Sequence, residues 1–383
     1  MTVRVGVLGL GSVFVTPYRT LIDRLAAQGR VELRAAFDPD PAKRRAIAEL
    51  TGADADLAGD ADLIARDDID AVLVLTSMPD HGRLAVAALE AGKHVLLEKP
   101  MATSLDDARR VLAASGSAPG RLVCAPHIVL SPTFRDMHDR IRAGAIGRPL
   151  SARGRYGWAG PWWASWYYQP GGGSLFDLGI YNLTSLCGIF GPVKRVTALV
   201  GTAIPERTIE GRAVRVESDD NSHVLLDFGE SRFASVMTGF TIQQYRSPAL
   251  EVYGAEGVLQ MMGDDWAPQG LELWRRESGV WEIIPESDPT WPWTDGLRHL
   301  VDCIERDVAP VNRPEHAYHV LEVALAAMRS SAEGRVIEIE SGFPELDYGS
   351  LPPDEADERR VHDPRTLVCG SGASGYLVLN GST

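Results

Sequence analysis

The chain has 383 residues, of which 45% are hydrophobic and 23% charged, and its formal net charge is −14. This length exceeds one typical hydrophobic core and predicts two domains, with three as the alternative. Negative charge repels nucleic-acid phosphates and anionic lipids, so we expect neither nucleic acid nor membranes as partners. Four scattered cysteines without a C-x-x-C pair, and an N-terminus without a signal-peptide pattern, predict a cytoplasmic protein with reduced thiols.

The first part of the chain alternates short apolar strands with helical patterns. We predict strands at 3–8, 31–38, 68–77 and 94–100, and helices at 17–28, 41–52, 83–92 and 104–115. Such an unbroken alternation is typical of a doubly wound parallel sheet. The sequence therefore predicts an N-terminal Rossmann domain over residues 1–124.

The pattern changes after about residue 125, because the expected strands become longer and alternate polar with apolar residues. These strands are expected at 148–157, 194–203, 222–230, 232–240, 250–261, 271–276 and 281–285, with helices near 132–143, 177–190, 294–306 and 314–331. Alternation is typical of an antiparallel sheet with one solvated face. We predict a C-terminal α/β domain over 125–340 with a large, mostly antiparallel sheet. Residues 341–383 are predicted to form an irregular arm on the body or on a neighbouring subunit.

A nucleotide site is predicted at the end of the first strand. Gly9 and Gly11 form a G-x-G turn, where backbone N–H groups can approach a pyrophosphate, although Phe14 replaces the third glycine of G-x-G-x-x-G. Asp38 ends the second strand, where a carboxylate binds ribose hydroxyls and repels a 2′-phosphate, which favours NAD over NADP. Two alternatives stay open: Asp38 is only a turn residue, or the basic pair 43–44 permits NADP.

Charged residues follow the buried strand that ends near residue 97. Glu98 and Lys99 precede Pro100 at the carboxyl end of this strand, where doubly wound folds bind ligands. A lysine at that edge would lie beside the nicotinamide of a bound cofactor. The alternative is a solvated strand end without a function.

These motifs resemble the glucose–fructose oxidoreductase / inositol dehydrogenase / rhizopine-catabolism (Gfo/Idh/MocA) family over about residues 3–340. The resemblance is carried by VGVLGLGSV, TSMPDHGRLAVAALEAGKHVLLEKP, IRAGAIGRP, GGGSLFDLGIYNL and HVLEVALAAMRSSAEGRVIEI. It implies an NAD(P)-dependent oxidoreductase that transfers a hydride between the nicotinamide and a hydroxyl of a sugar, polyol or glycoside, and that forms homodimers or homotetramers. Two alternatives are an NAD-dependent glycosidase or sugar lyase that oxidises C3 transiently, and a non-catalytic NAD(P)-binding sensor.

The resemblance also assigns roles to residues. It implies that Lys99, Asp177 and Tyr181 are catalytic, in a branch where tyrosine replaces the histidine of most members. A cis peptide bond is expected before Pro100. The implied cofactor contacts are Gly9, Gly11, Ser12, Val13, Phe14, Asp38, Thr76, Met78, His81, Glu98 and Lys99.

Physical chemistry is compatible with a catalytic tyrosine at this position. Residues four apart on a helix face the same way, so Asp177 and Tyr181 can address one ligand. A free phenol has a pKa of about 10, which is too high for an efficient base near neutrality, but a nearby ammonium lowers it. We expect Lys99 to supply this charge and Asp177 to orient either Lys99 or the substrate hydroxyl. The alternative is a helix-terminal acid and a core tyrosine.

An aromatic segment at 155–169 offers flat faces that suit the C–H faces of sugars. Within it we expect Trp158 and Trp163 to contact the substrate, although packing of a long loop or a subunit contact is an equal alternative. His127 is a further expected substrate contact, with a structural histidine as its alternative. No His, Asp or Glu grouping has metal spacing, and hydride transfer to NAD requires no metal.

Overall fold

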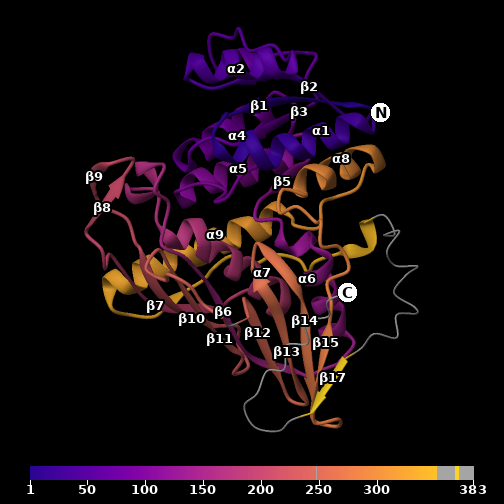
Figure 1. Cartoon of the computed structure of the whole chain (residues 1–383), viewed down its shortest axis with the longest axis vertical. Helices are drawn as coiled ribbons and strands as arrows, with labels where there is room; N and C mark the ends of the chain where they lie inside the picture. Colours follow the sequence, from indigo (N-terminus) through magenta and orange to yellow (C-terminus); the bar gives the residue numbers. More distant parts are fainter. Residues whose placement is uncertain (247, 352–366, 371–383) are drawn as a thin grey trace, which may run out of the picture.

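The computed structural model describes residues 1–246, 248–351 and 367–370. Figure 1 shows two layered bodies, with the parallel sheet in one and a long, curved sheet in the other. This arrangement confirms the predicted fold class.

The first sheet has the order β2-β1-β3-β4-β5, and every neighbouring pair is parallel. Its strands are β1 (Val3–Leu8), β2 (Val31–Phe37), β3 (Ala71–Val74), β4 (His94–Leu97) and β5 (Leu122–Cys124). Its helices are α1 (Arg19–Ala27), α2 (Pro41–Thr51), α3 (Asp60–Ile64), α4 (His81–Glu90) and α5 (Leu105–Ser117). Strands β1, β3 and β4 are largely buried on both faces, as their continuous apolar runs predict.

Local sequence signals set the ends of these helices. Asp40 precedes α2 and accepts a hydrogen bond from the N–H of Ala42 at 2.8 Å, and Gly52 ends the helix at a φ of +72°. Ser104 caps α5 in the same way, through the N–H of Asp107 at 3.1 Å. The helical segment after β1 instead begins at Ser12 and contains a π-helical turn, Phe14–Tyr18, which includes Pro17 and precedes α1.

The second sheet has the order β16-β7-β10-β11-β6-β12-β13-β14-β15-β17. Its strands are β6 (Pro149–Gly157), β7 (Arg195–Gly201), β10 (Asn221–Asp227), β11 (Phe233–Gly239), β12 (Leu250–Gly254), β13 (Gly257–Asp264), β14 (Ala267–Arg275), β15 (Val280–Ile284), β16 (Ile337–Glu338) and β17 (Leu367–Gly370). Among the pairs, β6 and β11 run parallel and the others antiparallel. A separate hairpin joins β8 (Glu206–Ile209) to β9 (Arg212–Arg215).

One face of this sheet is covered by α6 (Pro132–Arg142), α7 (Ile180–Phe190) and α9 (Pro314–Glu333), which share its core (Figure 1). Large apolar side chains on other parts of the sheet are exposed: Leu199, Leu225 and Phe233 are 76%, 57% and 50% accessible. The remaining helix, α8 (Gly296–Arg306), packs elsewhere. Its Leu297, Leu300 and Val301 join the core of the parallel sheet, although the predicted boundary assigns this helix to the second domain.

The predicted C-terminal arm is described only in part. Tyr348 donates a hydrogen bond to the carbonyl of Val129 at 2.8 Å, so the first residues of the arm lie on the body of this chain. The short strand β17 pairs with β15 at the edge of the large sheet. Residues 352–366 and 371–383 of the predicted arm lie outside the described residues.

Candidate active site

A cavity of about 1210 Å³ lies between the two domains, at the carboxyl ends of β1, β3 and β4. Most of the predicted site residues line it. They are Gly9, Gly11, Ser12, Val13, Asp38, Thr76, Met78, His81, Glu98, Lys99, Trp158, Trp163, Asp177 and Tyr181. Phe14 and His127 are outside this lining.

The glycine turn fits a dinucleotide for two different reasons. Gly9 has a φ of +96°, and a Cβ there would lie 2.6 Å from the carbonyl oxygen of Leu75, so glycine lets β1 and β3 approach closely. A Cβ on Gly11 would meet nothing within 4 Å, because Gly11 faces the cavity. The following helical segment begins at Ser12, so its N-terminus points its unpaired N–H groups toward the space that a pyrophosphate needs.

Asp38 lies just beyond β2 and is 7% exposed. Its carboxylate accepts hydrogen bonds from the N–H of Leu10 at 2.9 Å and from the N–H of Asp40 at 2.9 Å. The ammonium of Lys43 lies 3.3 Å away, at the rim of the same cavity. A fixed carboxylate fits ribose hydroxyls, whereas the adjacent cation is the group that a 2′-phosphate requires.

Glu98, Lys99 and Pro100 form the loop after β4, and the peptide bond between Lys99 and Pro100 is cis, as the resemblance implied. Glu98 is 6% exposed and is held from behind by Tyr18, whose hydroxyl donates to Oε1 at 2.8 Å. Its other oxygen accepts from the N–H of Lys99 at 3.1 Å. His81, 1% exposed, lies between this loop and the segment after β3, with Nδ1 2.7 Å from the carbonyl oxygen of Pro100 and Nε2 3.0 Å from that of Thr76.

The structure places two predicted contacts in the core instead of the cavity wall. Phe14 is 1% exposed and packs in the core of the parallel sheet. His127 is also 1% exposed; its Nε2 lies 3.4 Å from the hydroxyl of Tyr18, and its ring fills the space beside Gly296. Burial lowers the pKa of His127 to about 3, so it is neutral. This environment favours the alternative of a structural histidine for His127.

The segment Gly171–Gly173 is rich in glycine because it packs tightly. A Cβ on Gly172 would lie 2.5 Å from the carbonyl oxygen of Tyr167, and one on Gly173 would lie 2.2 Å from Asp219. Asp219 caps the helix that follows, because its carboxylate accepts from the hydroxyl of Ser174 at 2.6 Å and from the N–H of Leu175 at 2.8 Å. The helix then opens with a π-helical turn, Leu175–Gly179, before α7. Such turns often accompany functional sites.

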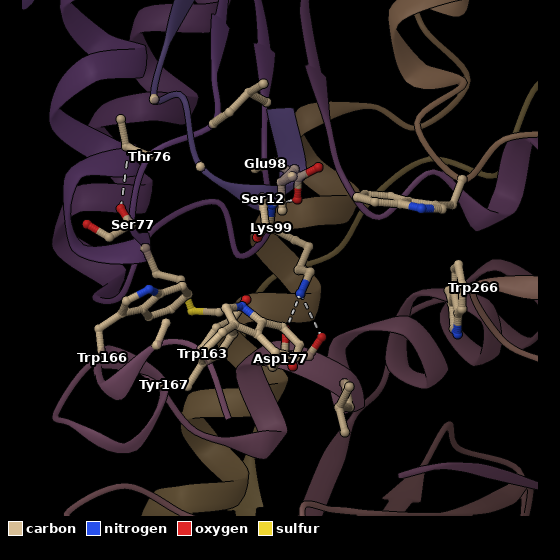
Figure 2. A pocket seen from close by; sticks show the side chains of 18 of the residues that line it. Ser12, Thr76, Ser77, Glu98, Lys99, Trp163, Trp166, Tyr167, Asp177 and Trp266 are labelled. Atoms are coloured by element: carbon tan, nitrogen blue, oxygen red, sulfur yellow. Dashed lines mark hydrogen bonds and ion pairs between the residues drawn. The ribbon is translucent and has the colours of Figure 1, made fainter. Parts of the chain in front are cut away.

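Three predicted catalytic side chains meet across the cavity. The ammonium of Lys99 donates to Oδ1 of Asp177 at 2.6 Å and to the backbone carbonyl of Asp177 at 2.8 Å (Figure 2). The two side chains are 11% and 12% exposed. The same ammonium lies 5.5 Å from the centroid of the Tyr181 ring, over its face. No hydrogen bond from the hydroxyl of Tyr181 is found among the described residues.

The predicted lowering of the Tyr181 pKa is wrong for this structure. Burial raises the pKa of Tyr181 well above its usual value, and the carboxylates of Glu98 and Asp177 raise it further. The ammonium of Lys99 is paired with Asp177 and lies over the ring instead of beside the hydroxyl. Tyr181 is therefore a protonated phenol near neutrality.

The aromatic segment forms one wall of the cavity. Trp158 and Trp163 stack with ring centroids 5.5 Å apart, and Trp166 and Tyr167 stack with centroids 3.7 Å apart. All four line the cavity, so the segment that supplies Trp158 and Trp163 contributes more rings than predicted. Trp162 is 67% exposed and does not line the cavity.

Other parts of the cavity lining come from segments that the motifs did not reveal. They are Gln243, Gln244, Tyr245, Asp264, Trp266 and Trp293. A tryptophan in the acidic, glycine-rich stretch GDDWAPQG was the only available sequence signal for Trp266. Tyr18, which donates a hydrogen bond to Glu98, belongs to the helical pattern after the glycine turn, and no motif indicated its role in the site.

Within the described ranges, no group of three or more His, Cys, Asp or Glu side chains is arranged to hold a metal ion. In the same ranges, no helix combines the length and apolar character that a membrane span needs.

Family models match both parts of the chain. Residues 3–124 match the oxidoreductase family with an NAD-binding Rossmann fold, and residues 134–260 match the GFO/IDH/MocA C-terminal domain. The chain belongs to the Gfo/Idh/MocA family. As a member of this family it is an oxidoreductase with an NAD-binding Rossmann domain.

Individual relatives extend over most of the chain. It is 28% identical to 1,5-anhydro-D-fructose reductase from Ensifer adhaerens over 291 residues, which is 74% of this chain and 83% of the relative. It is 25% identical to scyllo-inositol 2-dehydrogenase (NADP(+)) from Bacillus subtilis (strain 168) over 370 residues, which is 88% of this chain and 96% of the relative. A solved structure of levoglucosan dehydrogenase with NADH has a TM-score of 0.79 at 21% identity, covering 89% of this chain and 100% of the other. This likeness shows a shared fold.

Proposed function

We propose that this protein transfers a hydride between the nicotinamide of NAD(P) and a carbon that bears a hydroxyl group in a sugar, polyol or glycoside. One observation carries the proposal: Lys99, Asp177 and Tyr181 converge in the cavity that also holds the glycine turn and an aromatic wall. The names of the relatives, which act on sugars and inositols, support this substrate class.

The bound nicotinamide would accept or supply the hydride. The residues of this chain hold the dinucleotide: the N–H groups after Gly11 would bind the pyrophosphate, and Asp38 would bind the adenosine ribose. Lys43 beside Asp38 makes NADP a second carrier that the site tolerates.

Lys99 would bind the reacting oxygen of the substrate. An ammonium has three N–H donors, and Asp177 accepts two of them through its carboxylate and its carbonyl. The third can donate to the substrate, where the positive charge stabilises negative charge that develops on the oxygen. Asp177 thus fixes the position of the ammonium and the direction in which its third N–H can donate.

Tyr181 would move the proton. Because its pKa is raised, the phenol holds its proton at neutral pH and can donate it from Oη to the oxygen of a carbonyl that is being reduced. Oxidation of an alcohol needs the reverse transfer, from the substrate hydroxyl to a phenolate, which is scarce near neutrality. The proposal therefore favours reduction at neutral pH and oxidation at alkaline pH.

We also propose that the protein is a cytoplasmic homodimer or homotetramer. Cys124, Cys187 and Cys303 are free and buried, which suits a reducing compartment. The exposed apolar side chains of β7, β10 and β11, namely Leu199, Leu225 and Phe233, are candidates for a subunit contact.

The test is a panel of sugars, inositols and glycosides, followed through NADH or NADPH absorbance in both directions. We expect turnover with at least one member, and a loss of about 100-fold or more in Lys99→Met and Tyr181→Phe. Lys194→Met is the control, because Lys194 is exposed and does not line the cavity. Normal turnover in the two cavity variants would refute the proposal, and release of an aglycone without net NADH would favour the glycosidase alternative.

A further inference from the structure

The turn between β13 and β14 is attached to the active site at three consecutive residues. Asp264 accepts a hydrogen bond from the hydroxyl of Tyr245 at 2.5 Å. Asp265 is fully buried and faces α7. Trp266, which is half-buried, lines the cavity together with Asp264. A turn that is held at Asp264 and Asp265 presents Trp266 to the cavity in one geometry.

Asp265 ties this turn to the catalytic helix. Its two carboxylate oxygens accept from Nδ2 of Asn182 at 2.5 Å and from the hydroxyl of Ser185 at 2.8 Å. Asn182 directly follows Tyr181, so the turn and the proposed proton donor share one rigid support. Burying a carboxylate without a cation is unfavourable, and burial raises the pKa of Asp265 to about 7. Such a residue is unusual in a turn whose only role is to connect two strands.

The result is an aromatic surface on each side of the reacting groups. Figure 2 shows Trp266 on one side of Lys99 and Asp177, and Trp163, Trp166 and Tyr167 on the other. Because these groups are on opposite sides of Lys99 in the view and line one cavity, a ligand at Lys99 has aromatic side chains on both sides.

The two surfaces differ in their surroundings. In Figure 2, Trp163, Trp166 and Tyr167 are on the same side of Lys99 as Thr76 and Ser77, which follow β3 in the first domain. Trp266 instead follows Asp264 by two residues, and Asp264 is hydrogen-bonded to Tyr245; both line the cavity together with Gln243 and Gln244, and all of these come from the second domain. Carboxamide, carboxylate and phenol groups beside an indole face are the combination that binds a ring with hydroxyl groups at its edge.

We propose that the substrate is a glycoside whose reacting sugar ring lies at Lys99 and whose second ring packs against Trp266. This inference rests on the proposed function and narrows it to substrates with two rings. The second ring is a sugar or an aryl group, since both present a flat face to an indole. Trp266 is then a specificity residue on the turn that Asp265 joins to α7.

The test compares four forms of every sugar that is active in the panel: the free sugar, its methyl glycoside, its disaccharide and its 4-nitrophenyl glycoside. We expect the two-ring forms to have a kcat/KM roughly tenfold above that of the methyl glycoside, because one aromatic contact contributes up to about 1.5 kcal/mol. The disaccharide and the 4-nitrophenyl arms distinguish a sugar from an aryl second ring.

Trp266→Ala should lower kcat/KM for two-ring forms about tenfold more than for the methyl glycoside, mainly through KM. The matched control is Trp281→Ala, because Trp281 is a half-buried tryptophan of β15 outside the cavity lining. This variant should change kcat/KM neither for the two-ring forms nor for the methyl glycoside. Equal losses in Trp266→Ala for one-ring and two-ring forms, or wild-type turnover of free polyols and methyl glycosides only, would overturn the inference.

Calorimetry of the 4-nitrophenyl glycosides, with NAD present, tests the second-ring surface by binding alone. It therefore distinguishes a failure of this inference from a failure of the proposed hydride transfer. If no probe passes a hydride to NAD or NADP, the proposed function fails. Weaker binding to Trp266→Ala than to the wild type would then still support the second-ring surface, and equal binding would overturn it.

Discussion

The ion pair between Lys99 and Asp177 is the interaction on which the proposed chemistry depends most. Lys99→Met keeps the length of the side chain and removes the ammonium, and Asp177→Asn keeps the shape and removes the negative charge. Together with the double variant they form a cycle that measures the coupling of the two side chains. We expect both single variants to lose at least about 100-fold in kcat/KM.

The expected loss in the free energy of unfolding follows from the geometry. The pair is 2.6 Å apart with about nine-tenths of each side chain buried. Lys99→Met leaves a buried carboxylate without its cation, which costs about 3–5 kcal/mol. Asp177→Asn still offers an oxygen to the ammonium, so its cost is about 1–3 kcal/mol. The double variant buries neither charge, so its loss should be about 2 kcal/mol less than the sum of the two single losses.

Urea unfolding followed by circular dichroism measures these free energies. The control cycle is Arg109→Met with Asp106→Asn, a pair whose side chains are 58% and 81% exposed and whose coupling should stay below about 0.5 kcal/mol. A coupling for Lys99 and Asp177 no larger than this control would show that the two side chains do not form a buried pair in solution, and the proposed placement of the ammonium would be refuted.

Four further predictions concern the same cavity. Because the pKa of Tyr181 is raised, the wild-type oxidation rate should increase with pH through the alkaline range, while the reduction rate stays constant below that pKa. Tyr181→Phe should remove this pH dependence. A wild-type oxidation rate that is independent of pH would contradict the assignment of Tyr181 as the proton-transfer group. Asp38→Ser should shift the KM ratio toward NADP at least about tenfold, since it removes the carboxylate that repels a 2′-phosphate, and an unchanged ratio would place the ribose elsewhere. Gly11→Ala should have the urea midpoint of the wild type but bind NAD at least about tenfold more weakly, as measured by calorimetry. Gly9→Ala should weaken NAD binding and, in addition, lower the urea midpoint, because its Cβ would lie 2.6 Å from a backbone oxygen. Tyr18→Phe removes the hydrogen bond that holds Glu98, so the KM for NAD should rise and the pH profile of kcat should shift. If Tyr18→Phe changes only the free energy of unfolding, Tyr18 has a structural role alone.

Periodicity was sufficient for most of the fold. The apolar runs of β1, β3 and β4 and the alternation in β6, β10 and β11 predicted both sheets, because burial on two faces or one face dictates which positions are apolar. Periodicity did not predict that α8 packs on the parallel sheet, since an amphipathic helix does not specify its partner. Only the three-dimensional path of the chain returns it to the first domain.

The environment of Tyr181 could not be obtained from its spacing to Asp177. The motif correctly placed both residues at one cavity with Lys99, but the pKa of a phenol depends on the burial and charge of its whole surroundings. Asp177 forms an ion pair with the ammonium of Lys99, and the carboxylate of Glu98 adds a second negative charge that raises the pKa of Tyr181. The predicted phenolate therefore becomes a protonated phenol, which under the proposed function favours reduction near neutrality.

The sequence by itself determined the glycine turn, the charged loop after β4 and the glycine-rich entry to α7, because each requires particular residue types within a few positions of the chain. The tertiary structure alone decided which distant side chains complete the site. Tyr18 reaches Glu98 across 80 positions, and Asp265 reaches Asn182 across 83, which brings Trp266 opposite the aromatic wall. Such pairings leave no local pattern, since they arise when two domains and a ten-stranded sheet pack around one cavity.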